Sequence, residues 1–280
     1  VVSTGRPEAM NTIGEYHAVQ EQSGLWAVPF YVDTHHLLWV QKESWQTAAG
    51  AMDFQFTRLA KITPTHVGQA YSGFGITRTM DSLTVRNSEL WRAIFFQFNT
   101  SIPLFLTNNL LHRSAVYQDY PSTTHANTFV NNTFLGGSVT NAYSGGQWVF
   151  RNNLFDRTAI SLGADPVHGH NGYVTGFPQL PGSSSGNVVL TNNVAYEPGP
   201  YGDYYLGDVV LDNATAALRN AGSTNASALG LYHFTTHVDQ GKETNSIVDI
   251  GYHYVAVSPA DAFAASGGFS STQGANQWYY

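Results

Sequence analysis

The sequence predicts an all-β fold, a single-stranded parallel β-helix with about 21–23 residues in each coil and capping regions at both ends. Three observations favour this solenoid. An Asn-Asn step recurs in a fixed apolar frame, and its copies are nearly evenly spaced. The chain is also rich in aromatic residues, Gly, Asn, Ser and Thr but only 11% charged. Average proteins are about 25% charged, and this balance favours strands and loops over helices.

The Asn-Asn step marks the repeat. In every copy an apolar residue lies two positions before the first Asn, and another lies three positions after it. The copies begin at Asn87 (a weaker copy), Asn108, Asn131, Asn152 and Asn192. Successive copies are 21, 23, 21 and 40 residues apart, and Asn171 lies inside the longest gap. Repeats of this length are typical of solenoids, in which each unit packs on the next.

Asn suits the bend between two strands of a coil. It tolerates the left-handed backbone conformation and can bond to nearby backbone groups. When coils stack about 4.8 Å apart, Asn side chains can also bond to one another along the rod. We therefore expect a structural ladder formed by Asn108, Asn131, Asn152, Asn171 and Asn192. A leucine-rich-repeat horseshoe has a similar period, but it needs a Leu-rich frame that this sequence lacks.

The frame separates the first part of the chain from the repeats. Residues 1–80 do not show it and are expected to form an N-terminal cap or irregular first coils. Strand-like runs lie within them at 25–32, 37–40 and 52–56. Residues 81–196 form the predicted β-helix core, in which short strands with alternate inward side chains meet each Asn pair.

The frame stops where Pro and Gly interrupt it near residue 198. Residues 197–257 are expected to form C-terminal coils and a cap, because the uncovered end of a β-helix would pair with another chain. Residues 258–280 are expected to be a linker followed by the start of a further strand segment or module.

The composition limits the function. No cysteine is present among the 280 residues, which excludes disulfides, thiolate catalysis and Cys-bound metals. The net charge is −7, and the three lysines and nine arginines are not clustered, so nucleic acid is not an expected partner. No apolar run approaches the roughly 20 residues that cross a bilayer, so membrane insertion is not expected.

One segment carries a weak metal-binding pattern. Asp165, His168 and His170 form a His-x-His step beside a carboxylate, and alternate strand residues share a face. The alternative, which we favour, is a polar loop that joins two coils. No catalytic residue or cofactor is predicted. Glycoside hydrolysis needs two carboxylates about 5–9.5 Å apart, and no acidic stripe recurs from coil to coil.

Several Asn residues match the acceptor pattern for glycosylation. Asn99, Asn213 and Asn225 each begin an Asn-x-Ser/Thr triplet and are possible acceptors. Asn131 also begins one, but we expect it in the ladder instead.

Two groups of residues resemble known exported proteins. Residues 146–156 (GQWVFRNNLFD) and 170–174 (HNGYV) resemble the right-handed parallel β-helix repeats of large exported bacterial proteins. The ending resembles the closing segment of uncharacterised β-helix proteins of the Verrucomicrobia and Planctomycetes type. Its matching strings are residues 220–224 (NAGST), 230–236 (GLYHFTT), 242–244 (KET) and 248–254 (VDIGYHY).

The resemblance covers roughly residues 81–257, and residues 269–280 resemble the opening of a β-sandwich module. It implies a right-handed, extracellular β-helix within a multi-domain surface protein, and it implies no reaction. His233 and His253 lie in the ending among aromatic residues. Such a cluster could stack on sugars, although packing of a cap predicts the same pattern.

These observations favour a non-enzymatic, structural or adhesive module of a bacterial surface or secreted protein. A rod with strand-like ends can associate with itself, so a homo-oligomer or filament is an expected partner. The alternative is a polysaccharide-binding or polysaccharide-degrading protein, for which glycans would be the partners. A panel of glycans, tested for binding and for released ends, separates the two.

Overall fold

The computed structural model describes residues 2–14, 50–60, 80–92, 94–97, 103–118, 126–141, 146–207 and 213–257. The predicted strand-like runs at 25–32 and 37–40, the predicted linker at 258–280 and Asn99 lie outside these residues. Within them the regular structure is almost entirely β, as predicted.

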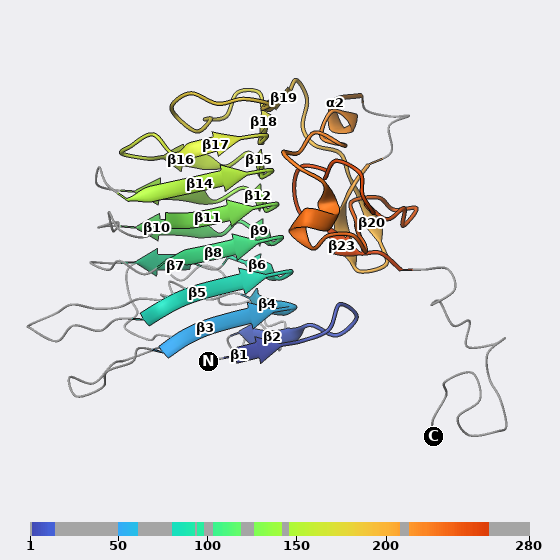
Figure 1. The fold of residues 1–280 in the computed structure, drawn as a ribbon, viewed down its shortest axis with the longest axis horizontal. Helices are drawn as coiled ribbons and strands as arrows, with labels where there is room; N and C mark the ends of the chain where they lie inside the picture. The colour runs from blue at the N-terminus through green and yellow to red at the C-terminus, as the bar shows by residue number, and fades with distance from the viewer. Residues whose placement is uncertain are drawn as a thin grey trace, which may run out of the picture.

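Three parallel sheets make up most of the fold (Figure 1). The seven-stranded sheet contains β1 (Val2–Thr4), β3 (Gly50–Gln55), β5 (Met80–Arg86), β8 (Leu104–Thr107), β11 (Ala126–Val130), β14 (Gln147–Arg151) and β17 (Val167–Gly169). The eight-stranded sheet contains β2 (Asn11–Gly14), β4 (Thr57–Ala60), β6 (Glu89–Trp91), β9 (Leu110–His112), β12 (Thr133–Leu135), β15 (Leu154–Asp156), β18 (Gly172–Val174) and β19 (Val188–Leu190). The four-stranded sheet contains β7 (Ile94–Gln97), β10 (Ala115–Gln118), β13 (Ser138–Asn141) and β16 (Ala159–Ser161).

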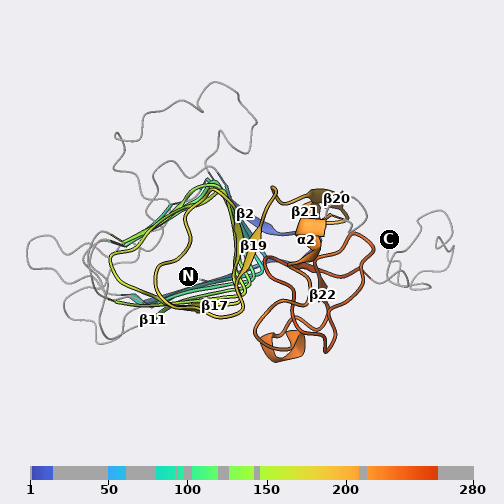
Figure 2. The same cartoon turned by 90° about the horizontal axis from the view of Figure 1, so that it is seen from above.

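The chain visits the three sheets in a fixed order. Strands β8, β9 and β10 each join a different sheet, and β11, β12 and β13 then repeat the same order. Each strand pairs in parallel with the equivalent strand of the round before it. Figure 2, which looks along the stack, shows the sheets on three sides of a common interior. This arrangement is compatible with an all-β solenoid.

The length of one round changes along the stack. Asn109 and Asn132, at equivalent places in successive rounds, are separated by 23 residues, and Asn132 and Asn153 by 21, as the Asn spacing predicts. The separation falls to 18 between Asn153 and Asn171, and to 16 between Asn171 and Asn187. The pairing of the last strands shortens in the same way. The predicted coil length therefore does not hold for the last rounds.

The stack begins earlier than the sequence predicts. Residues 1–80 were expected to form a cap or irregular coils, yet β3 and β4 pair in register with β5 and β6, and β1 and β2 pair with β3 and β4. Phe56 and Thr57 occupy the place of the Asn pair, and Phe56 takes the left-handed conformation at φ 46°. The Thr57 N–H donates to Ser88 Oγ at 3.0 Å. The Asn signal is absent here because other residues form the same bend.

The interior is built from rows of stacked side chains. Phe129 stacks on Phe150 with ring centroids 4.6 Å apart, and Phe134 stacks on Phe155 at 4.9 Å. Tyr173 continues the second row at 5.4 Å from Phe155. All five side chains are buried. Burying one such side chain contributes about 1.5–3 kcal/mol, so these rows are a main source of stability.

The loop after β18 closes the interior at the last round. Leu180 is only 5% exposed and packs into the same apolar cluster as Phe155 and Tyr173. Later in this loop, the Ser185 carbonyl accepts the His170 N–H at 2.9 Å. This loop, and not residues 197–257, therefore supplies the apolar plug at that end.

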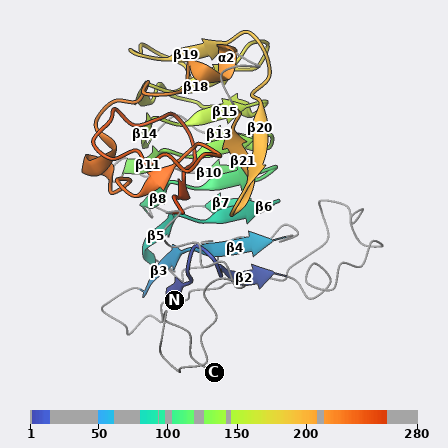
Figure 3. The same ribbon diagram turned by 90° about the vertical axis from the view of Figure 1, so that its right-hand side faces the viewer.

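Residues 196–207 and 213–257 lie along the outer face of the eight-stranded sheet (Figures 1 and 3). They contain the antiparallel hairpin β20 (Tyr196–Gly199) and β21 (Gly202–Leu206), the short helices α2 (Asn213–Ala216) and η2 (Ala226–Leu229), and the antiparallel pair β22 (Phe234–Thr235) and β23 (Tyr254–Val255). Tyr205 and Tyr254 stack with centroids 4.2 Å apart and share an apolar cluster with Leu110. The residues predicted to cap the end thus form a lateral segment (196–207 and 213–257), since their aromatic side chains cover the sheet.

In the described part of the chain no helix has the length and apolar character needed to span a bilayer.

Candidate functional site

The Asn pairs form two parallel rows at one corner of the stack. In the first row the backbone is left-handed at Asn87, Asn108, Asn131, Asn152 and His170, with φ between 50° and 57°. The second row contains Asn109, Asn132, Asn153, Asn171 and Asn187. Predicted ladder residues Asn108, Asn131 and Asn152 therefore lie together, and they mark the bend as expected.

The second row is saturated with hydrogen bonds. Asn153 Oδ1 accepts the backbone N–H of Asn132 at 3.0 Å and its side-chain N–H at 2.9 Å. Asn153 Nδ2 donates to the Phe129 carbonyl, also at 2.9 Å. Asn109 and Asn132 repeat this pattern, and all three are fully buried. These amides hold successive rounds together.

Two of the predicted ladder residues are placed differently. Asn171 aligns with Asn153 in the second row, because Leu154 is aligned with Gly172. Asn192 is exposed and follows the end of β19. The shortened last rounds explain both differences. The regular spacing of 21–23 residues places the next bends too far along the chain, whereas the bend of this round is at His170.

The predicted metal pattern is not assembled. His168 is 5% exposed and aligned with Phe150, so it lies in the interior, and burial lowers its pKa. His170 is at the left-handed bend, and its Nδ1 lies 3.1 Å from the Ala221 carbonyl. Asp165 is exposed. The two His residues do not share a face because the bend at His170 turns its side chain away.

The possible glycosylation acceptors are spread over different environments. Asn225 is exposed and immediately precedes η2, while Asn213 is the first residue of α2. Asn131 is fully buried, which removes it as an acceptor in the folded chain.

The lateral segment uses the first Asn row as its attachment line. Asn108 Oδ1 accepts the His253 N–H at 2.7 Å, and Asn108 Nδ2 donates to the His253 carbonyl at 2.9 Å. Asn131 Nδ2 donates to the Asp249 carbonyl at 3.1 Å. Asn152 Oδ1 accepts the Ser223 N–H at 2.8 Å. Asn108, Asn131 and Asn152 thus each bind backbone of the lateral segment.

A cluster of ionisable side chains is buried where that segment docks. Asp249, 2% exposed, accepts hydrogen bonds from the Thr236 hydroxyl and from the Asn220 N–H at 2.7 Å. His237 Nε2 lies 3.4 Å from Asp249 Oδ2. Burial works to raise the pKa of Asp249. The His237 hydrogen bond, the charge of His253 and the Thr236 and Asn220 donors outweigh that effect, so the pKa lies below its ordinary value.

A second carboxylate–histidine pair lies beside the first. His253 is fully buried, and its Nδ1 is 2.9 Å from the Gly251 carbonyl, so Nδ1 carries a proton and donates it. Its Nε2 lies 3.2 Å from Glu243 Oε1, while Ser246 Oγ donates to Glu243 Oε2 at 2.9 Å.

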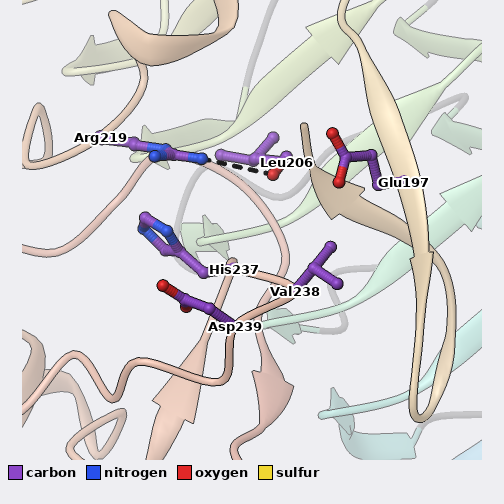
Figure 4. A pocket seen from close by; sticks show the side chains of 6 residues that line it. All are labelled: Glu197, Leu206, Arg219, His237, Val238 and Asp239. Atoms are coloured by element: carbon purple, nitrogen blue, oxygen red, sulfur yellow. Dashed lines mark hydrogen bonds between the residues drawn. The ribbon is translucent and has the colours of Figure 1, made fainter. Parts of the chain in front are cut away.

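Two open clefts meet at His237. The first, of about 330 Å³, lies between the β20–β21 hairpin and the loop after β22 (Figure 4). Its lining residues are Glu197, Leu206, Arg219, His237, Val238 and Asp239. The second, of about 270 Å³, shares His237 and Asp239 and is also lined by Asn220, Gly241, Lys242, Glu243, Thr244, Ser246 and Asp249.

The clefts can bind polar groups through His237. Its side chain is 28% exposed, whereas Asp249 behind it is 2% exposed. A buried carboxylate that orients a solvent-facing His is an arrangement found at binding and acid–base sites. Among the residues that the structure describes, no group of three or more His, Asp or Glu side chains has the arrangement of metal ligands.

Sequence reasoning found only part of this cluster. It singled out His253, and Glu243 and Asp249 lie in the matching strings of the ending, but His237 lies outside them and the four residues match no motif spacing. Comparison with known proteins gives no further guidance, since no family model, no curated protein and no solved structure matches the chain.

Proposed function

We propose that the chain is a right-handed, single-stranded parallel β-helix that works as a rigid, non-enzymatic module of an extracellular or surface protein. The Asn rows carry this proposal. In an enzyme built on such a stack, recurring polar residues would be expected to face a substrate. Here Asn109, Asn132 and Asn153 are fully buried and bond the rounds to one another.

Handedness follows from a general rule. Connections between parallel strands of the same sheet are right-handed in about 98% of cases, and the chain makes such a connection in every round. The ending that resembles exported surface proteins, and the absence of cysteine, support an extracellular or cell-surface location.

A structural module of this kind can also assemble. Strands β1 and β17 are the two ends of one sheet, and β2 and β19 are the two ends of another. A head-to-tail contact between copies would extend both sheets in parallel, giving an open assembly. Light scattering and negative-stain images at several protein concentrations test this homo-oligomer or filament. Monomers at every concentration would rule it out.

The experiment for the non-enzymatic rod is a panel of neutral and acidic polysaccharides incubated with the protein. We expect no released reducing ends and no unsaturated products. Release that survives repurification, and is lost on replacing His237 with Ala, would overturn the non-enzymatic proposal.

A second candidate is a polysaccharide-binding or polysaccharide-degrading protein. The cleft beside His237 favours it, because carboxylates, a guanidinium and an imidazole surround two apolar side chains there. Retention on insoluble glycan without released ends would support binding alone.

A further inference from the structure

The cleft in Figure 4 is assembled from three separate stretches of the lateral segment. The β20–β21 hairpin supplies Glu197 and Leu206, the turn after α2 supplies Arg219, and the loop after β22 supplies His237, Val238 and Asp239. Its volume of about 330 Å³ is at the lower end of the range for small-molecule sites, which begins near 300 Å³. The space suits one ring-sized unit.

The polar side chains of the cleft are held in place from behind. Arg219 Nη2 donates to the Gly207 carbonyl at 3.0 Å and to the Leu206 carbonyl at 3.4 Å. His237 is oriented by the buried Asp249, and its backbone N–H donates to Thr235 Oγ1 at 2.9 Å. Asp239 Oδ1 accepts the Gly241 N–H at 2.9 Å. Groups fixed in this way lose little freedom when a ligand binds.

The charge and polarity of the cleft select the ligand class. The lining contains two carboxylates, Glu197 and Asp239, and one guanidinium, Arg219, whose Nη2 is already bonded to backbone. An anionic ligand would meet excess negative charge. Leu206 and Val238 add apolar surface between the polar groups. A neutral sugar has the matching character, since its ring combines C–H faces with a rim of hydroxyl groups.

We infer that this cleft binds one neutral sugar unit of a glycan, with His237 and Asp239 bonding to its hydroxyl groups and Val238 packing on the ring. The inference rests on the glycan-contact function given above as the second candidate, and it names the site of that contact. It does not require the protein to cleave the glycan.

Saturation-transfer NMR with methyl glycosides of glucose, galactose, mannose and N-acetylglucosamine tests the inference. Glucuronic acid and glucosamine serve as anionic and cationic probes. We expect at least one neutral glycoside to bind with a Kd of about 1 mM, a value reasonable for one small ring. Because the ligand is uncharged, added salt should not weaken the binding.

Three variants locate the site. His237→Ala and Asp239→Asn should each weaken binding by about tenfold, equivalent to about 1.4 kcal/mol. Asp239 is exposed, so Asp239→Asn remains informative if His237→Ala disturbs folding. Asp203→Asn is the matched control, because Asp203 is an exposed carboxylate of β21 that lines neither cleft, and it should leave binding unchanged.

The contrary outcomes are distinct. Binding of neutral glycosides that both cleft variants leave intact would overturn this site while the glycan-contact function stands. No binding of any neutral glycoside at about 10 mM, ten times the expected Kd, would overturn both. Binding of glucosamine alone would overturn the neutral class, because charge would then be the feature recognised.

Discussion

Asn109 and Asn132 are joined twice. Asn132 Oδ1 accepts the backbone N–H of Asn109 at 3.0 Å and also its side-chain N–H at 3.0 Å. Asn132 Nδ2 donates to the Leu106 carbonyl at 2.8 Å. The buried amide of Asn132 thus hydrogen-bonds to three groups of the round before it. Asn153, in the next round, accepts the backbone and side-chain N–H groups of Asn132 in the same way. The row links the rounds without any residue from outside the stack.

Replacing Asn132 with Ala should therefore be strongly destabilising. The change leaves the Asn109 N–H and the Leu106 carbonyl buried without these partners, and each such group costs about 1–3 kcal/mol. We expect a loss of about 3 kcal/mol in the free energy of unfolding, measured by urea denaturation. Asn192→Ala is the control, because Asn192 is exposed, and it should change stability by less than about 0.5 kcal/mol. Equal effects would contradict the structural role of the row.

Gly137 is required by a close backbone contact. A Cβ at this position would lie 2.0 Å from the Ser114 carbonyl oxygen, and the backbone is left-handed at φ 77°. Gly176 is also left-handed, at φ 89°, but a Cβ there meets no atom within 4 Å. Gly176→Ala should therefore show only the backbone penalty, about 1 kcal/mol. Gly137→Ala should cost clearly more in urea denaturation, and similar losses in the two variants would refute the contact.

The bend residues explain which parts of the fold the sequence could predict. Asn108, Asn131 and Asn152 lie in evenly sized rounds, so their spacing revealed both the repeat and the bend. Phe56 forms the same bend with a different side chain, and the rounds before β5 therefore left no Asn signal. Asn192 belongs to an Asn pair in the sequence, but it does not lie in either Asn row, because this pair follows a shortened round by chance.

The candidate site was less predictable for a physical reason. Asp249 and His237 meet within the lateral segment, and the place of that segment on the sheet is fixed by contacts over more than one hundred residues, such as the bond from Asn131 to the Asp249 carbonyl. Local patterns do not encode such a contact. Asp165, His168 and His170 are close in sequence, yet the left-handed bend at His170 turns that side chain away from the face of His168.

His168 ends the row that contains Phe129 and Phe150, and it is a source of acid sensitivity. Burial lowers its pKa from 6.5, so the folded chain favours the neutral ring. Its contribution to stability is complete above pH 6.5 and declines as the pH falls from there toward the folded pKa. Both ring nitrogens are buried without a hydrogen bond of good geometry, and the nearby Pro181 and Gly182 backbone offsets only part of the effect of burial on the pKa.

His168→Phe should extend the aromatic row and remove that sensitivity. We expect it to raise the free energy of unfolding by about 1 kcal/mol at neutral pH, because a buried and poorly hydrogen-bonded polar group is lost. The advantage over the wild type should grow as the pH falls from 6.5. Urea denaturation at a series of pH values measures it. A destabilised variant at all pH values would show that the His168 ring nitrogens are bonded.

The fold favours the ionised form of Asp249, whereas it favours the neutral form of His168. Its folded pKa lies below the ordinary value of 3.8, so its contribution is complete above that pH and is lost as the pH falls through the folded pKa. Asp249→Asn should destabilise the chain at neutral pH, since it removes the carboxylate that receives the Thr236, Asn220 and His237 donors. The difference between wild type and variant should shrink as the pH falls from 3.8 toward the folded pKa, because the carboxylate of the unfolded wild type takes up its proton first. Hydrogen exchange at the amides of residues 218–223 and 248–254 provides the local readout, because these residues attach the lateral segment. Faster exchange confined to them at neutral pH is the expected result, and a loss spread evenly over the three sheets would show that Asp249 supports the whole stack instead.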